Sequence, residues 1–173
     1  YSSALRNDGG DLSITDSLIT SNSLGLAGCG TASLIRCSVV ANSGGIRHDG
    51  DLTIESCEIS GNDGGDGLDN YSIGAVHCRG NVQISNSRIR NNVYGSPFAI
   101  VSRAKQPSAR INLPSCHFHE LPRLPAAGIG YQAFRDRELL SVVGCEISGN
   151  RNYEFLNPFG AGGIYIQQYS TCL

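Results

Sequence analysis

Three carboxylates gathered in one glycine-rich stretch are the residues of this sequence best suited to hold a ligand. Asp63, Asp66 and Asp69 lie within residues 61–70. Ca²⁺ takes several oxygen ligands, so these side chains predict a candidate calcium site, although no glutamate closes the loop as in an EF-hand. Aspartate and glycine also build tight exposed turns without any ligand. Both interpretations stay open.

The same acids are the starting point for any catalytic hypothesis. A polysaccharide lyase needs a metal held by acids and a basic group that removes the proton next to the uronate carboxyl. Arg88 follows about one repeat later and could supply that base. The catalytic candidates are therefore Asp63, Asp66, Asp69 and Arg88, and the sequence assigns a catalytic role to none of them.

An internal repeat must position these residues. Each copy has a small or polar residue, two alternating apolar residues, a Cys or Ser marker, one more apolar residue and usually an Asn. The markers lie 20, 20, 30, 29 and 29 residues apart, and they are Ser17, Cys37, Cys57, Ser87, Cys116 and Cys145. A repeat of this period predicts stacked units that share one core.

Each copy contains two short stretches of alternating apolar and polar residues, which is the pattern of a strand. In the third copy Leu52 and Ile54 face one way, whereas Thr53 and Glu55 face the other. A third, weaker strand precedes each motif, as at residues 44–46. Three strands and three corners per copy predict an all-β parallel β-helix solenoid of about six to seven coils, each 20–30 residues long.

Stacking places equivalent residues of neighbouring copies about 4.8 Å apart. Three inward columns are then expected, in the order of the sequence. They are Leu12, Ala32, Leu52, Val82, Ile111 and Leu140; Ile14, Leu34, Ile54, Ile84, Leu113 and Val142; and Ile19, Val39, Ile59, Ile89, Phe118 and Ile147. A series of asparagines should close one corner, because asparagine tolerates left-handed backbone and can bond a stacked asparagine. Its members are Asn22, Asn42, Asn62, Asn92 and Asn150.

The copies have the form Gly-x-Leu-x-Ile-x-x-Cys-x-Ile-x-x-Asn and cover residues 9 to 166. In this they resemble the right-handed parallel β-helix repeat family, the pectate-lyase-like superfamily. The resemblance implies a right-handed coil. Family members include polysaccharide lyases and hydrolases, adhesins, phage tailspikes and structural proteins of cell surfaces. The Asn-Thr-Asp, Gly-Asp-Asp, Gly-His-Gly and Arg-Ile-Lys segments of the polygalacturonase pattern do not occur in this sequence, so we expect a non-catalytic member.

The repeat lengthens after Asn62, and the additional residues always follow the Asn corner. They predict loops on one flank, at residues 63–75, 93–108, 122–137 and 151–162. Aromatic residues gather in or beside these loops, either to pack them onto the body or to line a groove for a sugar chain or a partner protein. The candidate ligand-binding residues are Tyr71, Tyr94, Phe98, Tyr131, Phe134 and Tyr153.

The sequence has seven cysteines and no Cys-x-x-Cys pair, which argues against a structural zinc site. The marker cysteines are expected to pack as buried thiols. Cys29 and Cys78 belong to copies separated by a whole coil, so we do not expect them to pair with each other. The family resemblance implies secretion, and one glycosylation sequon, beginning at Asn70, agrees with it.

Charge is divided unevenly along the chain. Residues 1–69 carry three basic and ten acidic side chains, a net −7, whereas residues 70–173 carry ten basic and five acidic ones, a net +5. This division predicts head-to-tail association, or it is an accidental distribution on a solvated surface. The sequence contains no signal peptide, no apolar run long enough to span a membrane and no Met. We expect residues 1–173 to form a single domain and to be a segment of a longer chain.

These observations favour an extracellular or cell-surface module with a structural, adhesive or assembly role. Its expected partners are flanking parts of a longer chain, neighbouring subunits, and a polysaccharide or surface glycan. We expect no cofactor other than the candidate Ca²⁺, and no nucleic acid. The alternative is a carbohydrate-active enzyme, a polysaccharide lyase or hydrolase of the pectate-lyase-like class.

Overall fold

The structure is a computed structural model, and it describes residues 3–64, 74–94, 110–112, 117–119, 127–132, 139–152 and 163–167. These residues form strands and no helix, which confirms the all-β class. The strands are β1 (Ser3–Thr15), β2 (Leu18–Thr20), β3 (Leu24–Ile35), β4 (Ser38–Val40), β5 (Ile46–Glu55), β6 (Glu58–Ser60), β7 (Val76–Arg79), β8 (Val82–Ser85), β9 (Arg88–Arg90), β10 (Val93–Tyr94), β11 (Arg110–Asn112), β12 (His117–His119), β13 (Ala127–Gln132), β14 (Leu139–Val143), β15 (Glu146–Ser148), β16 (Arg151–Asn152) and β17 (Gly163–Gln167).

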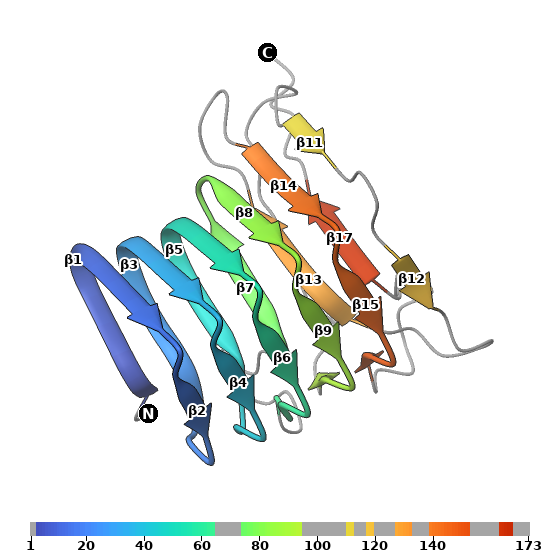
Figure 1. The fold of residues 1–173 in the computed structure, drawn as a ribbon, viewed down its shortest axis with the longest axis horizontal. Coiled ribbons are helices and arrows are strands. Elements are labelled where there is room, and N and C mark those ends of the chain that lie inside the picture. The colour runs from blue at the N-terminus through green and yellow to red at the C-terminus, as the bar shows by residue number, and fades with distance from the viewer. Residues whose placement is uncertain are drawn as a thin grey trace.

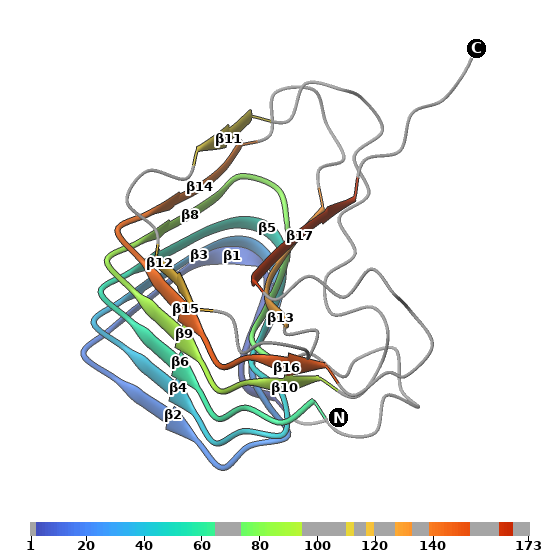
Figure 2. The ribbon, with the colours of Figure 1, turned by 90° about the vertical axis from the view of Figure 1, so that its right-hand side faces the viewer.

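The described strands form three sheets in which every pairing is parallel (Figures 1 and 2). The largest sheet has nine strands, the second has the order β12-β15-β9-β6-β4-β2, and the third consists of β10 and β16. In the largest sheet β5 pairs with β7 near its start, where Ile46 faces Val76, and with β8 near its end, where Leu52 faces Val82. The predicted weaker strand is separate as β7 and β13, whereas in the second and third repeats it is continuous with the first motif strand, as β3 and β5, so the prediction of three separate strands was wrong there.

The predicted inward columns form the core. Ala32, Leu52, Val82 and Leu140 are each at most 1% exposed, and they line up through the parallel register of β3, β5, β8 and β14. Described members of the second and third columns are buried in the same way, at most 1% exposed: Leu34, Ile54, Ile84, Val142, Val39, Ile59, Ile89 and Ile147. Burying each of these large side chains contributes about 1.5–3 kcal/mol. Leu12 is only partly buried, because it belongs to the end strand β1, which has a neighbour on one side.

The order of the repeats along the stack differs from their order in the sequence. We predicted the fifth repeat between the fourth and the sixth, but β14 pairs directly with β8, and β15 pairs with β9. The fifth repeat, with β11 and β12, lies on the far side of the sixth. The corner asparagines agree with this order. Asn92 bonds the amide oxygen of Asn150 at 2.9 Å, whereas the fifth repeat has Leu121 at that position.

The corners depend on left-handed backbone, but not at the residue we predicted. The Asn column does not itself adopt positive φ within the described residues; the residue before each Asn does. These residues are Ser21, Ala41, Gly61, Asn91 and Gly149, with φ between 52° and 61°. The residue before each described marker behaves in the same way, at Asp16, Arg36, Ser56, Asn86 and Gly144. The asparagines stabilise the corner through their side chains instead.

Candidate functional site

Two of the four candidate catalytic residues, Asp63 and Arg88, are described by the structure, and they have different neighbours. Asp63 is exposed and forms an isolated parallel bridge with Val93. Arg88 is exposed on β9, in register between Glu58 and Glu146, and its Nε lies 3.7 Å from Oε2 of Glu146. The strand pairing therefore does not bring Arg88 beside Asp63. The other two candidates, Asp66 and Asp69, fall outside the described residues.

The candidate calcium site remains a prediction for the same reason. Among the described residues, no group of three or more His, Cys, Asp or Glu side chains is placed to hold a metal ion. Two of the three aspartates proposed as ligands are not among those residues. The sequon residue Asn70 also lies outside them, so its glycosylation stays a prediction as well.

The loops do begin on one flank. Asp63 bridges Val93, and Val93 pairs in turn with Arg151 through β10 and β16. Three predicted loops thus start at neighbouring positions along one edge, as Figure 2 shows for β10 and β16. The prediction of the remaining loop, at residues 122–137, was partly wrong, because residues 127–132 form β13 in the largest sheet.

The aromatic candidates are placed only in part. The backbone of Tyr94 ends β10, where it faces Asn152. The backbone of Tyr131 lies in β13, between Cys78 of β7 and Ile166 of β17. The remaining aromatic candidates fall outside the described residues: Tyr71, Phe98, Phe134 and Tyr153. The choice between loop packing and an aromatic groove is therefore still open.

A charged column runs across the outer face of the second sheet. Arg90 of β9 donates from Nη2 and Nε to Oε1 of Glu58, at 2.8 and 3.0 Å. Ser60 donates to the same oxygen at 2.8 Å. Partial burial opposes ionisation of Glu58 and is the largest single influence, but the bonds from Arg90 and Ser60 together lower the pKa of this carboxyl. The carboxylate is thus held by the neighbouring strand.

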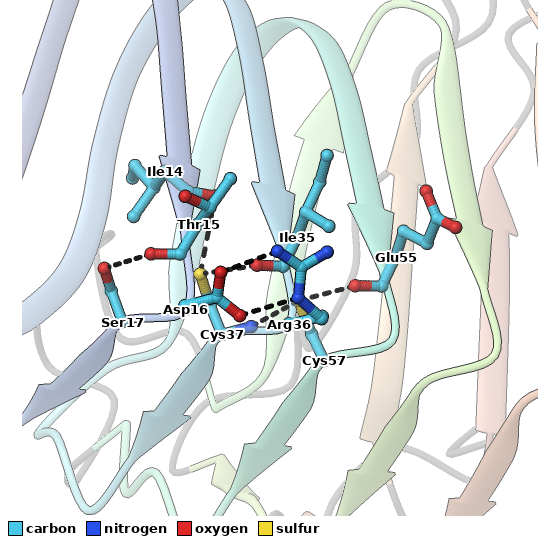
Figure 3. A network of polar contacts seen from close by, with 9 residues as sticks. All are labelled: Ile14, Thr15, Asp16, Ser17, Ile35, Arg36, Cys37, Glu55 and Cys57. Carbon is cyan, nitrogen blue, oxygen red and sulfur yellow. Dashed lines mark hydrogen bonds and ion pairs between the residues drawn. The ribbon is translucent and has the colours of Figure 1, made fainter.

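A further ion pair lies at the marker corner (Figure 3). Arg36 donates from Nε and Nη2 to the two carboxylate oxygens of Asp16, both at 2.6 Å. The hydrogen bond from Arg36 lowers the pKa of Asp16. Asp16 and Arg36 occupy the same left-handed position in successive repeats, and both side chains are more than half exposed. This pair can link two repeats at the surface, and solvent screens much of its energy.

Three marker cysteines, Cys37, Cys57 and Cys145, are buried and lie outside disulfides, as predicted, and Cys116 falls outside the described residues. The Sγ of Cys57 lies 3.2 Å from the carbonyl oxygen of Glu55 and 3.4 Å from that of Leu34. Burial raises the pKa of the Cys57 thiol above its ordinary value. A thiol held in this way is a poor nucleophile, because the thiolate is the reactive form.

Cys29 and Cys78 also lie outside disulfides, but they occupy different environments. Cys78 is fully buried, and desolvation raises its pKa strongly. Cys29 is exposed on the outer face of β3, in register between Asp8 and Asp49. The register places Cys78 beside His48 rather than beside Asp49, so the two thiols lie on opposite faces of the sheet.

His48 is a buried polar residue that we did not predict from the sequence. It is 0% exposed, and its Nε2 lies 3.0 Å from the carbonyl oxygen of Gly30. Donation to that carbonyl places the proton on Nε2 and leaves Nδ1 buried without a partner in the described structure. The alternation that starts at Ile46 would have signalled this inward position.

The asparagine column has a direction. The backbone N–H and the Nδ2 of each Asn donate to Oδ1 of the next Asn, from Asn22 to Asn42, then to Asn62, Asn92 and Asn150. The Nδ2 atoms of Asn42, Asn62, Asn92 and Asn150 also donate to a main-chain carbonyl of an adjacent repeat. These bonds occupy the amide groups, which supports the prediction that the asparagines are structural.

Comparison with protein-family models, with curated proteins and with solved structures found no match. The described part of the chain contains no helix that is long and apolar enough to cross a membrane.

Proposed function

We propose that this chain is a segment of a right-handed parallel β-helix that acts outside the cell or on its surface as a structural, adhesive or assembly module. The observation that carries the proposal is the alignment of three loop starts along one edge, at Asp63, Val93 and Arg151. Loops that leave a repeat body along one edge commonly form its binding surface.

The solenoid part of the proposal is supported by register and corners. The first four repeats pair in parallel, each with its successor in the sequence. The residues that face one another hold equivalent positions of the motif and are 20 or 30 residues apart in the sequence. Left-handed residues recur immediately before the marker and before the Asn in every such repeat. A right-handed path agrees with the usual hand of connections between parallel strands.

The structural role is supported by the use of the polar side chains. The Asn column and the marker column hold successive repeats together through hydrogen bonds. Chemistry would have to come from the extended loops, which the first two repeats lack. An extracellular location rests on the family resemblance and on the sequon at Asn70.

Binding of an acidic polysaccharide tests this role, because the loops belong mostly to the half of the chain with net charge +5. Immobilised polygalacturonate in the presence of Ca²⁺ is the probe, because Ca²⁺ held by the loop aspartates would bridge the protein to the carboxylates of the polymer. Deleting residues 64–73 converts the third repeat to the 20-residue length of the second and removes Asp66 and Asp69, so the fold should persist while Ca²⁺-dependent binding weakens. Arg36→Gln, in a repeat that has no extended loop, is the control and should bind like the parent chain.

Equal binding by the deletion variant would contradict a loop-borne site. Release of unsaturated uronate products, detected by their near-ultraviolet absorbance, would instead support the polysaccharide lyase. Circular dichroism and thermal unfolding of each variant verify that a loss of binding is not a loss of fold.

A further inference from the structure

We propose that Nδ1 of His48 and Sγ of Cys78 form a binding site for one soft monovalent metal ion, Cu(I), inside the stack of repeats. The site lies between β5 and β7 and is separate from the loops that carry the proposed function. In the parallel register of these strands His48 faces Cys78, and both residues are 0% exposed. Neighbouring strands lie about 4.8 Å apart, so the two side chains are neighbours in the interior.

The hydrogen bond of His48 is the one that metal-binding histidines make. Its Nε2 donates to the carbonyl oxygen of Gly30 at 3.0 Å. A histidine that binds a metal through one ring nitrogen almost always donates the other N–H to a carbonyl, a carboxylate or a water, and this bond fixes the tautomer. The bond to Gly30 therefore leaves the lone pair on Nδ1, which is the form that binds a metal.

The direction of the ring brings Nδ1 toward β7. The residue of β3 that faces His48 is Gly28, which has no side chain to keep the imidazole from reaching Gly30. The two ring nitrogens of an imidazole point to nearly opposite sides, so Nδ1 is directed away from β3. On that side of β5 lies β7, where Cys78 holds the register position.

Nδ1 of His48 is buried and has no hydrogen-bond partner in the described structure. A buried acceptor without a partner costs free energy, and in a native protein it calls for a water, an ion or a functional role. Asn7, a polar residue of the same interior column, cannot supply a donor, because its amide already bonds Gly10 and Thr31. A metal ion bound to Nδ1 and to the Cys78 thiolate satisfies the imidazole.

The two ligands select the ion. Structural zinc takes four protein ligands, whereas the described residues contain no group of three or more His, Cys, Asp or Glu placed to hold a metal. Thiolates select soft ions such as Cu(I), and imidazole also suits copper. Cu(I) forms one bond to Sγ and one to Nδ1, and the thiol proton leaves to solvent. Because Cu⁺ replaces H⁺, the net charge of the buried site does not change. A divalent ion would leave an uncompensated positive charge there, which is costly.

Refolding of the 173-residue chain from urea with Cu(I), in the absence of oxygen, tests the proposal. Both ligands are buried, so the ion has to be loaded as the chain folds. The chelator bicinchoninate keeps free Cu(I) low, and only the tightest site then fills. We expect one Cu(I) per chain. X-ray absorption at the copper K-edge should show one sulfur and one nitrogen ligand.

Two variants remove one ligand each. His48→Gln keeps all seven cysteines and can still donate to the Gly30 carbonyl, and Cys78→Ser removes the sulfur. Each should bind Cu(I) at least about tenfold more weakly than the parent chain. Cys57→Ser is the matched control. It removes another buried thiol, at a marker position where Ser87 shows that serine is accepted, and it should bind Cu(I) like the parent chain.

Absence of bound Cu(I), a spectrum with sulfur ligands alone, or unchanged affinity of His48→Gln would overturn the proposal. Sulfur ligands alone would mean that the ion binds other thiols and that an internal water satisfies Nδ1. Thermal unfolding of the metal-free variants verifies that they are folded. The X-ray absorption result comes from the parent chain, so it decides the question even if a variant does not fold.

Discussion

Asn42 gives two hydrogen bonds to a single atom, the Oδ1 of Asn62, from its backbone nitrogen at 3.1 Å and from its Nδ2 at 3.0 Å. Both residues are nearly fully buried. One side-chain oxygen therefore satisfies a main-chain donor and a side-chain donor of the preceding repeat. This relationship recurs along the column, and it accounts for the asparagine that ends most copies of the motif.

Asn62→Asp should destabilise the fold strongly. The Nδ2 of Asn62 donates to Asn92 Oδ1 and to the Val39 carbonyl, both at 2.9 Å. A carboxylate would place an oxygen against both acceptors in a buried site. Breaking such a buried pattern costs about 3–5 kcal/mol. Urea unfolding measures this loss in the free energy of unfolding.

The control for this experiment is Asn22→Asp at the end of the same column. The Asn22 side chain is more exposed, and its Oδ1 accepts no bond from an earlier described repeat. We expect a much smaller loss there. Equal losses at the two positions would show that the column is not what stabilises the corner.

Arg90→Gln should raise the pKa of Glu58. Burial by itself opposes ionisation of this carboxyl, and the bonds from Arg90 do most to offset it. Because the folded pKa is lowered in the parent chain, the carboxyl stabilises the fold above the ordinary glutamate pKa of about 4.3. That stability disappears as pH falls through the lower folded value. NMR titration of the Glu58 side chain measures the shift.

Arg88→Gln is the matched control for this prediction. Arg88 acts on Glu58 only through its charge and makes its own ion pair with Glu146. We expect the Glu58 pKa to rise less than in Arg90→Gln. A larger rise in the Arg88 variant would contradict the assignment of the bond to Arg90.

Thiol alkylation of the folded chain should reach Cys29 well before the four buried cysteines. Cys29 is exposed, whereas Cys37, Cys57, Cys78 and Cys145 are buried. Desolvation raises the pKa of Cys57 and of Cys78, which further lowers their thiolate fraction. Iodoacetamide labelling followed by peptide mass spectrometry distinguishes the sites. Labelling of Cys78 as fast as Cys29, without denaturant, would contradict this environment.

Ser87→Ala should cost about 1–3 kcal/mol, because it leaves a buried main-chain donor without a partner. Ser87 Oγ accepts the Cys57 N–H at 3.0 Å and donates to the Ser85 carbonyl at 2.7 Å. Ser87→Cys is the control, since Cys57 Sγ plays the same part for the Cys37 N–H at 3.3 Å. We expect the cysteine variant to lose less stability in thermal unfolding. Equal losses of stability in the alanine and cysteine variants would mean that side-chain packing, and not the hydrogen bond, determines the contribution of position 87.

The sequence predicted the inward columns because alternation fixes which face each residue takes. Val39, Ile59 and Ile89 are buried for that reason. The sequence did not predict which corner residue has a positive φ. Asp16 and Ala41 both adopt this conformation although they are different residue types.

The order of the last repeats was also beyond the pattern. In the structure β14 pairs with β8 and β15 with β9, and Asn92 bonds Asn150, 58 positions later in the sequence. The period of the repeat carries no signal for contacts that pass over a whole copy. For the candidate site, the sequence correctly predicted that three loops begin along one edge, at Asp63, Val93 and Arg151. The residues of the loops themselves lie mostly outside the described structure.

Gly50→Ala should destabilise the chain although the residue lies in a regular strand. Gly50 faces Gly30 in the register of β3 and β5, and a Cβ on Gly50 would run into the Gly30 carbonyl oxygen. Because that oxygen belongs to the main chain, a rotamer change cannot relieve the contact. Overpacking of this kind costs about 1–3 kcal/mol. Thermal unfolding measures the loss.

Gly10→Ala is the matched control, because Gly10 also opens a copy of the motif. A Cβ there would meet only the side-chain oxygen of Asn7, at an ordinary contact distance of 3.9 Å. The strand β1 also has no described neighbour on its outer side. We expect the Gly10 variant to unfold close to the parent temperature and the Gly50 variant to unfold well below it. If both variants lost the same stability, close approach of neighbouring strands would not be the reason for glycine at the start of the motif.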